Sequence, residues 1–240
     1  GIPYVLDYLE QLRIPTENMQ KDLSLSLGSG QLTPMQLARG FAVIANGGYD
    51  VTPYLIQSIR DNDDKIVYQA PKTIFCEGKE DCARKAEENL ASEITLPSEQ
   101  SEQEETPGRD VRLAERLADK RSVYILHSMM QDVIKRGTGR RALALGRSDI
   151  AGKTGTTNNQ RDAWFAGFNT RIATAAWVGF DNSSPLGRGE YGARAALPIW
   201  LDYMEVALAD TPPAVMPRPN GIVSVRIDPE TGKRAPAGQE

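Results

Sequence analysis

The sequence predicts a mixed fold of helices and strands, because it combines amphipathic helical patterns with a pair of closely linked apolar runs. The two runs, residues 163–168 and 172–180, are apolar on both alternating faces, and only Asn169-Thr170-Arg171 separates them. Runs that follow each other so closely pair as an antiparallel hairpin, and strands apolar on both faces lie in a sheet covered on both sides. Residues 150–157 are a third strand candidate.

Four segments have the apolar spacing of helices. They are residues 3–13, residues 33–46, residues 119–136 and a segment that begins at Pro198. Thr33 suits the N-cap of the second helix, Pro34 suits its first turn, and Gly47 follows its end. The third helix has a continuous apolar stripe and is expected to stop at Gly137.

Two other stretches lack a helical pattern. Residues 51–68 are predicted to be extended, with a turn at 61–64. Residues 70–110 are rich in Glu, Ser, Gln, Lys and Pro, and such a segment buries too little apolar area to offset its ordering entropy. We interpret 70–110 as a mobile surface insertion within one domain, with a linker between domains as the alternative. In the tail, residues 222–227 could add one more strand.

The composition excludes several kinds of partner. The net charge is -4 and no basic stripe is present, so nucleic acid is not expected as a partner. The mean hydropathy is -0.43, and no apolar run approaches the roughly 18 residues of a membrane span. The first residues lack the pattern of a signal peptide, so any targeting segment or membrane anchor is expected only upstream.

Two cysteines and one histidine cannot supply the four ligands of a structural zinc site, and no metal or cofactor is expected. The spacing of Cys76 and Cys82 favours two free thiols and a small surface disulfide equally, and the disulfide needs an oxidising compartment. We interpret His127 as a packed or surface histidine rather than a catalytic one, because no nucleophile and acid partners are recognisable.

The segment Ala-Gly-Lys-Thr-Gly-Thr-Thr-Asn-Asn at residues 151–159 is compatible with two chemistries. A phosphate-binding P-loop requires a glycine at position 147, where the chain has Arg147; Gly146 is one residue too early. A P-loop also opens a helix, whereas the residues that follow here have the pattern of a strand. The sequence therefore argues against nucleotide binding.

The alternative is the Lys-Thr-Gly strand of serine penicillin-recognising enzymes. Lys153 offers a positive charge to a carboxylate, and Thr154 and Thr156 lie two residues apart on one face of a strand, where they add hydroxyl donors. Gly155 lets a substrate approach the backbone closely. The backbone N–H of Thr156 can help to bind an oxyanion.

Five strings, one of which contains this triplet, carry a further signal. They are Arg-Gly-Thr-Gly-Arg-Arg-Ala at 136–142, Asp-Ile-Ala-Gly-Lys-Thr-Gly-Thr-Thr at 149–157, Asp-Ala-Trp-Phe-Ala-Gly-Phe at 162–168, Thr-Pro-Met-Gln-Leu-Ala at 33–38 and Ala-Asn-Gly-Gly at 45–48. Together they resemble the bifunctional class A high-molecular-mass penicillin-binding proteins, and within that class the type 1A members of Gram-negative bacteria. The resemblance implies an α/β (mixed α+β) fold, with an antiparallel sheet flanked by helices. It makes residues 1–210 the C-terminal part of a transpeptidase domain and 211–240 an extension.

The resemblance also implies serine acyl transfer, in which Ser-x-x-Lys and Ser-x-Asn motifs supply the nucleophile, its base and a proton relay. Neither motif occurs in this chain: no lysine follows a serine by three residues, and no asparagine follows one by two. We expect an upstream segment to carry both motifs and this chain alone to be inactive. A degenerate, non-catalytic homologue is the alternative.

By resemblance, the complete protein is a peptidoglycan D,D-transpeptidase on the periplasmic side of the bacterial inner membrane. Its partners are then stem peptides ending in D-Ala-D-Ala and β-lactam antibiotics. Lys153 and Thr156 are assigned catalytic roles, and Lys153, Thr154, Gly155 and Thr156 are assigned to substrate binding. A D,D-carboxypeptidase, a β-lactamase and a non-catalytic module of a cell-wall assembly are the alternatives.

Overall fold

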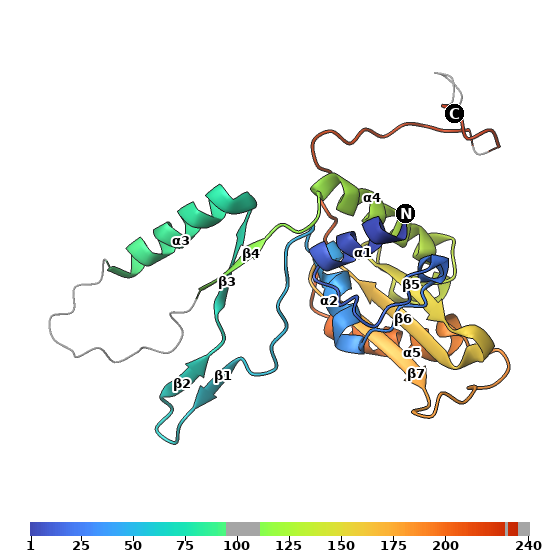
Figure 1. Cartoon of the computed structure of the whole chain (residues 1–240), viewed down its shortest axis with the longest axis horizontal. Coiled ribbons are helices and arrows are strands. Elements are labelled where there is room, and N and C mark those ends of the chain that lie inside the picture. Colours follow the sequence, from blue (N-terminus) through green and yellow to red (C-terminus); the bar gives the residue numbers. More distant parts are fainter. Residues whose placement is uncertain (95–110, 229, 235–240) are drawn as a thin grey trace.

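The computed structural model describes residues 1–94, 111–228 and 230–234. The helices are α1 (Ile2–Gln11), α2 (Pro34–Ala45), α3 (Gly78–Ile94), α4 (Lys120–Lys135) and α5 (Gly192–Ala207), with the short 3-10 helices η1 (Leu23–Leu27), η2 (Arg140–Leu145) and η3 (Asn158–Gln160). The strands are β1 (Ser58–Arg60), β2 (Ile66–Gln69), β3 (Lys72–Cys76), β4 (Val111–Glu115), β5 (Ala151–Thr156), β6 (Asp162–Phe168) and β7 (Ala173–Gly179). Figure 1 shows a body of helices around β5, β6 and β7, from which β1 to β4 and α3 project.

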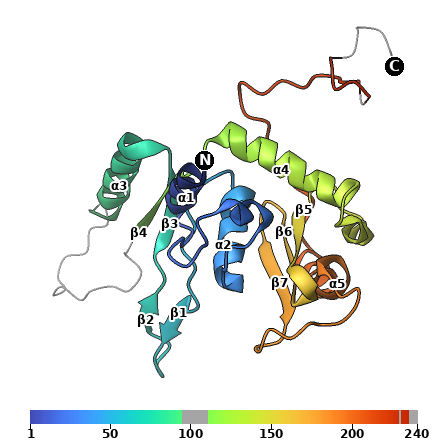
Figure 2. The same ribbon diagram turned by 45° about the vertical axis from the view of Figure 1, so that its right-hand side comes forward.

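The body is built on an antiparallel sheet with the strand order β5-β6-β7. Helix α5 covers one face of the sheet, and α2 and α4 lie on the other side (Figures 1 and 2). Phe165 packs against Trp200 of α5 with 4.9 Å between ring centroids. Phe168 points the opposite way and packs against Phe41 of α2 and His127 of α4. The predicted hairpin, and its place in a sheet covered on both sides, are confirmed.

The helices of the body begin where local capping chemistry places them. The Thr33 side chain accepts a hydrogen bond from the backbone of Gln36, whose side chain accepts one from the backbone of Thr33, so α2 starts with a complete capping box. Asp119 caps α4 through the backbone amides of Arg121 and Ser122. Both starts agree with the sequence pattern.

The prediction that a helix begins at Pro198 is wrong. Helix α5 begins at Gly192, and Pro198 lies inside it. Proline is favoured in a first turn, but an interior proline is tolerated when tertiary packing outweighs its missing N–H. Here the apolar face of α5 is buried on both sides of the proline, from Ala196 to Met204. That burial keeps the helix continuous.

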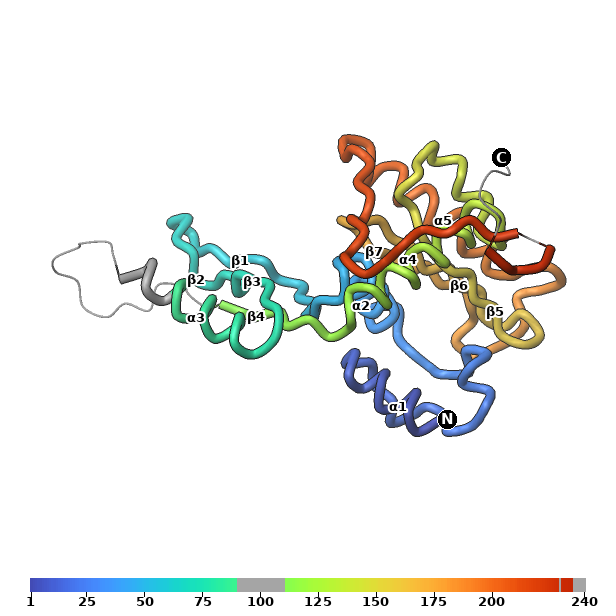
Figure 3. Tube along the Cα trace, turned by 90° about the horizontal axis from the view of Figure 1, so that it is seen from above, coloured from blue at the N-terminus to red at the C-terminus, as the bar shows by residue number. Residues whose placement is uncertain are grey.

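Residues 52–94 and 111–115 form an arm that extends away from the body, as Figure 3 shows from above. The arm holds the antiparallel pair β1–β2 and the pair β3–β4, which is parallel. Helix α3 packs on β3 and β4. Part of the segment interpreted as a mobile insertion, residues 72–94, thus forms β3 and α3, whereas residues 95–110 lie outside the described part of the chain.

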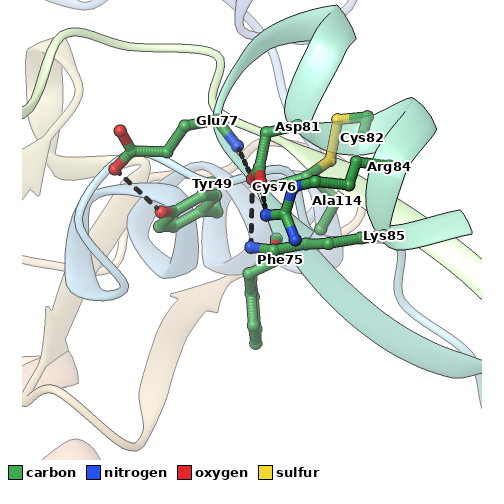
Figure 4. Close-up of a disulfide and its surroundings, with 9 residues drawn as sticks. All are labelled: Tyr49, Phe75, Cys76, Glu77, Asp81, Cys82, Arg84, Lys85 and Ala114. Carbon is green, nitrogen blue, oxygen red and sulfur yellow. Dashed lines mark hydrogen bonds and ion pairs between the residues drawn. A yellow bond between two sulfur atoms is a disulfide. The ribbon is translucent and has the colours of Figure 1, made fainter. Parts of the chain in front are cut away.

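A disulfide between Cys76 and Cys82 joins the end of β3 to the first turns of α3 (Figure 4). The two Cα atoms are 4.9 Å apart, and Cys76 is fully buried. Next to the disulfide, the Asp81 carboxylate accepts a hydrogen bond from the backbone N–H of Glu77 and forms an ion pair with Lys85. The ammonium of Lys85 also donates to the carbonyl of Phe75. The structure therefore contains the disulfide and not two free thiols.

After α5 the chain returns along the body before it leaves it. Arg147 bonds the carbonyl of Thr211 at 2.6 Å, and Met216 is buried against Ala118 and Val123. Residues 222–227, where a strand is expected, contain no named strand; Ile227 makes one isolated bridge, to Arg234. Among the described helices, none has both the length and the apolar character needed to cross a bilayer.

Candidate active site

The Lys-Thr-Gly triplet lies on β5, an edge strand of the sheet. Lys153 pairs with Ala166, Gly155 pairs with Trp164, and Thr156 pairs with Ala163. No named strand borders the other side of β5 in the described residues. The predicted site therefore faces an open sheet edge.

The pairing pattern fixes which backbone groups point to that edge. Just beyond β5, the amide of Thr157 donates to the carbonyl of Asp162 at 3.1 Å, and hydrogen-bonded pairs alternate along an antiparallel ladder. Lys153 and Gly155 are therefore turned towards β6, whereas the N–H and C=O groups of Thr154 and Thr156 point away from it. The ammonium of Lys153 donates to the outward carbonyl of Thr154 at 2.8 Å. The positive charge of Lys153 thus meets two outward amides, those of Thr154 and Thr156, for which residues 1–94, 111–228 and 230–234 supply no hydrogen-bond partner.

Side chains alternate between the two faces of β5. Thr154 and Thr156 lie on the α5 face, opposite Phe165 and Ala163 on the neighbouring strand. Lys153 lies on the other face, and its long chain curls to the edge. Lys153 and Thr156 are exposed to solvent. The predicted residues thus lie together at the end of β5 that is open to solvent, with Thr154 and Gly155 half-buried.

The hydroxyl of Thr156 is oriented by the first turn of α5. It accepts a hydrogen bond from the backbone N–H of Gly192 at 3.1 Å, so its own proton is left to donate elsewhere. The contact depends on glycine: a Cβ atom on Gly192 would lie 2.2 Å from the carbonyl oxygen of Trp164. The α5 N-terminus therefore rests directly on the β5–β6 ladder.

A residue outside the strand contacts the second hydroxyl. The Oγ1 atoms of Thr138 and Thr154 are 2.7 Å apart. Thr138 follows α4, in the string Arg-Gly-Thr-Gly-Arg-Arg-Ala. Thr138 is not among the site residues predicted from the sequence, although it lies in one of the strings that carry the resemblance.

Just before β5, a buried ion pair supports the strand. Arg147 donates to both carboxylate oxygens of Asp149, at 3.0 and 2.9 Å, and the Asp149 side chain is fully buried. Asn169 and the backbone N–H of Ala214 also donate to Asp149. Burial raises the pKa of Asp149, but the hydrogen bonds from Arg147, Ala214 and Asn169 outweigh it, and the pKa lies below its ordinary value.

His127 is part of the core under β5 and not of the open edge. It is buried on α4, 5.4 Å from the ring of Phe168, and its Nε2 atom has no hydrogen-bond partner in the described residues. Burial and the charge of Lys135 lower its pKa. The interpretation of His127 as a packed residue agrees with this position.

At the far end of β5, the turn to β6 is held by Asp162. This carboxylate accepts from the hydroxyl of Thr157 at 3.1 Å and from the indole N–H of Trp177 at 3.0 Å.

Among the described residues, no cluster of histidine, cysteine, aspartate or glutamate side chains has the grouping of a metal site. The chemistry that this edge supports is the binding of an anion and a carbonyl oxygen by donors.

Comparison with known proteins identifies the family. Residues 10–205 match the model of the penicillin-binding protein transpeptidase domain. The chain belongs to that family. It is 44% identical over 99% of its length to penicillin-binding protein 1A of Pseudomonas aeruginosa. This confirms the resemblance to class A, type 1A penicillin-binding proteins.

Solved structures of the transpeptidase family have the same fold. The crystal structure of penicillin-binding protein 1A from Haemophilus influenzae covers the whole chain with a TM-score of 0.80 at 32% identity. The PonA1 protein from Mycobacterium tuberculosis, in complex with penicillin V, covers 92% with a TM-score of 0.65 at 21% identity, which shows the fold alone. The predicted fold class is confirmed. The chain spans only 30% of the Pseudomonas protein and 36% of the Haemophilus one.

Proposed function

We propose that this chain is part of a peptidoglycan D,D-transpeptidase and supplies the substrate-binding edge of its active site. One observation carries the proposal: a transpeptidase-family strand presents Lys153, two threonine hydroxyls and the amide of Thr156 together at an open sheet edge. An extended peptide that ends in a carboxylate has the matching groups. Its charge pairs with a lysine, and its backbone pairs with a strand edge.

Each residue then has a role in acyl transfer. Lys153 attracts the terminal carboxylate of a stem peptide, or the equivalent acid of a β-lactam, and the hydroxyls of Thr154 and Thr156 donate to the bound ligand. Gly155 keeps the strand free of a side chain at its centre. The amide of Thr156 stabilises the negative oxygen that forms when the penultimate D-Ala carbonyl is attacked.

The nucleophile is proposed to come from an upstream segment with the Ser-x-x-Lys and Ser-x-Asn motifs. Its serine attacks the carbonyl carbon, and the bond to the terminal D-Ala breaks, so that D-Ala leaves with a proton. The amine of a second stem peptide then attacks the acyl-enzyme, displaces the serine and forms the cross-link. With a β-lactam the ring amide opens instead, and the acyl-enzyme persists. This chain alone is proposed to be inactive.

We place the domain on the periplasmic side of the inner membrane, anchored through a segment upstream. The disulfide between Cys76 and Cys82 supports that compartment, because disulfides persist where the environment is oxidising. In this proposal, residues 1–210 complete the transpeptidase domain, 70–110 form an insertion in it, and 211–240 form an extension.

A labelling experiment tests the proposal. The full-length protein, its Lys153→Ala variant and the 240-residue chain are incubated with fluorescent penicillin. The full-length protein should be labelled, Lys153→Ala should lose at least roughly tenfold in labelling rate because a charge-assisted contact is lost, and the chain alone should stay dark. Lys72→Ala, at an exposed position of β3, serves as the control and should label normally.

The outcomes separate the candidate functions. Labelling of the 240-residue chain would reveal a nucleophile within it. No labelling of the full-length protein would favour a non-catalytic module. Rapid loss of the label by hydrolysis would favour a β-lactamase, and release of D-Ala without cross-linking would favour a carboxypeptidase. Normal labelling of Lys153→Ala would remove Lys153 from the site.

A further inference from the structure

Thr138 is held at β5 by a tight loop that has a glycine on either side of it. Gly137 and Gly139 flank it, and a Cβ atom on Gly137 would lie 2.8 Å from the Cα atom of Val133. A Cβ atom on Gly139 would lie 2.8 Å from Ile134, and the amide of Gly139 donates to the carbonyl of Val133 at 2.9 Å. The loop therefore folds back on the last turn of α4, and Thr138 has a fixed position relative to that helix.

From this loop, the hydroxyl of Thr138 reaches the hydroxyl of Thr154 at 2.7 Å, at an exposed position. Neither hydroxyl has a further hydrogen-bond partner in residues 1–94, 111–228 and 230–234. The pair holds two protons, and the bond between the two oxygens uses one of them. One proton is left to donate to a group outside the protein.

The neighbouring charge decides which hydroxyl keeps that proton when an anion is bound. Lys153 donates to the backbone carbonyl of Thr154 at 2.8 Å, so its ammonium group lies beside Thr154. A carboxylate drawn to Lys153 accepts hydrogen bonds and has no proton to give. Thr154 must then donate to the carboxylate, and its oxygen must accept from Thr138. Hydrogen bonds in such a chain polarise one another and strengthen.

We propose that Thr138 is a positioning residue for the carboxylate of the donor substrate: it donates to Thr154, so that Thr154 donates to the bound anion. The inference rests on the proposed transpeptidase function and extends its carboxylate-binding group beyond β5, to the loop between α4 and η2. Penicillin is the probe, because it has a carboxylate and reports acylation directly.

A merely structural role is the competing explanation, in which the hydroxyl contact only attaches the loop to the strand. Removal of the hydroxyl would then lower the melting temperature and would impair every acylating ligand alike. A positioning role instead affects the binding of ligands that carry a carboxylate. Penicillin and its methyl ester, in which the carboxylate is masked, distinguish the two explanations.

The experiment compares the full-length wild type with Thr138→Val, which keeps the shape of the side chain, and Thr138→Ser, which keeps the hydroxyl. For penicillin, Thr138→Val should lower the second-order acylation rate constant about fivefold to tenfold, the size of one lost hydrogen bond, mainly by weakening binding before acylation. Thr138→Ser should restore it to within about twofold. For the methyl ester, Thr138→Val and wild type should react at equal rates.

Two controls complete the design. Thr170→Val removes a hydroxyl 3.5 Å from the carbonyl of Ala214, in the turn between β6 and β7, and should leave acylation unchanged. The double variant Thr138→Val, Thr154→Val should lose no more of the acylation rate constant than Thr154→Val alone, because Thr138 acts only through Thr154.

An unchanged penicillin rate in Thr138→Val would overturn the inference, and so would an equal loss for penicillin and its ester. Additive losses in the double variant would also overturn it. If the wild type itself is not acylated, the proposed function has failed, and that result is distinct from a failure of Thr138.

Discussion

Gly192 at the start of α5 lies so close to β5 that a Cβ atom on it would be 2.6 Å from the carbonyl oxygen of Gly155. The same residue donates its backbone N–H to the hydroxyl of Thr156. The first turn of a helix has free N–H groups, and one of them here orients a hydroxyl of the candidate site. The position of α5 and the geometry of β5 are therefore coupled through a residue without a side chain.

Gly192→Ala should displace α5 from the sheet, because the nearest atoms are backbone and cannot move aside. We expect a loss of about 2–3 kcal/mol in the free energy of unfolding, the size typical of overpacking, measured by urea unfolding of the 240-residue chain. Gly40→Ala is the matched control. A Cβ atom there would meet only Ile14, at 3.6 Å, and alanine favours the helix. Equal stability of Gly192→Ala and wild type would contradict the close approach.

Much of the body follows from local sequence, and the strongest cases are those where one residue determines the local geometry. Thr33 predicts the start of α2 because its side chain satisfies a free backbone amide, and the structure has that bond. The turn at Asn169 predicts the β6–β7 hairpin, since Asn169 Oδ1 accepts from the backbone of Arg171 and Ile172. Such signals are contained within a few residues of the chain.

The features that the sequence did not predict depend on contacts between distant residues. The residues next to Gly192 in the sequence do not indicate that position 192 must be a glycine. Glycine is required there because the backbone of Trp164, distant in the sequence, leaves no room for a Cβ atom. The parallel pair β3–β4 joins residues on either side of a long polar segment, and Cys76 is buried against Ala114. A polar composition indicated a segment without a core, but a disulfide and a partner strand supply the missing constraint.

The buried pair of Arg147 and Asp149 should contribute to the loss of stability in acid. Hydrogen bonds to the Asp149 carboxylate lower its pKa in the folded chain. As the pH falls, Asp149 is therefore protonated at a higher pH in the unfolded chain than in the folded one. The stabilising contribution is therefore complete well above pH about 4 and is lost as the pH falls below it. Asp149→Asn should cost about 3–5 kcal/mol at pH 7, because Arg147 loses its charged partner in a buried site.

Urea unfolding at pH 7 and at pH 3.5 tests the role of Asp149. The difference in the free energy of unfolding between wild type and Asp149→Asn should be smaller at pH 3.5 than at pH 7. Asp63→Asn, in the exposed turn between β1 and β2, should match wild type at both values. A gap that stays constant between the two pH values would contradict the lowered pKa.

His127 should control stability in a separate, higher pH range. Burial and Lys135 lower its pKa in the folded state, so below pH about 6.5 the unfolded chain takes up a proton that the folded chain does not. Stability should fall as the pH drops through this range. His127→Leu should abolish this fall, because it removes the only histidine of the chain. The urea midpoints of wild type and variant at pH 7.5 and 5.5 measure this fall. If the variant loses as much stability as wild type between the two pH values, a group other than His127 causes the effect.

The disulfide of the arm should stabilise the arm without affecting the candidate site. Cys76→Ser with Cys82→Ser opens a loop with a sequence separation of 6, for which closure is worth about 2 kcal/mol. Hydrogen exchange of α3 and β3 should accelerate, since β4 is the one strand that pairs with β3 in the part of the chain that the structure describes. Exchange in β5 to β7 should stay unchanged, because their core is formed with α2, α4 and α5. Faster exchange in β5 would mean that the arm and the open edge are coupled, and penicillin labelling of the full-length variant would then fall as well.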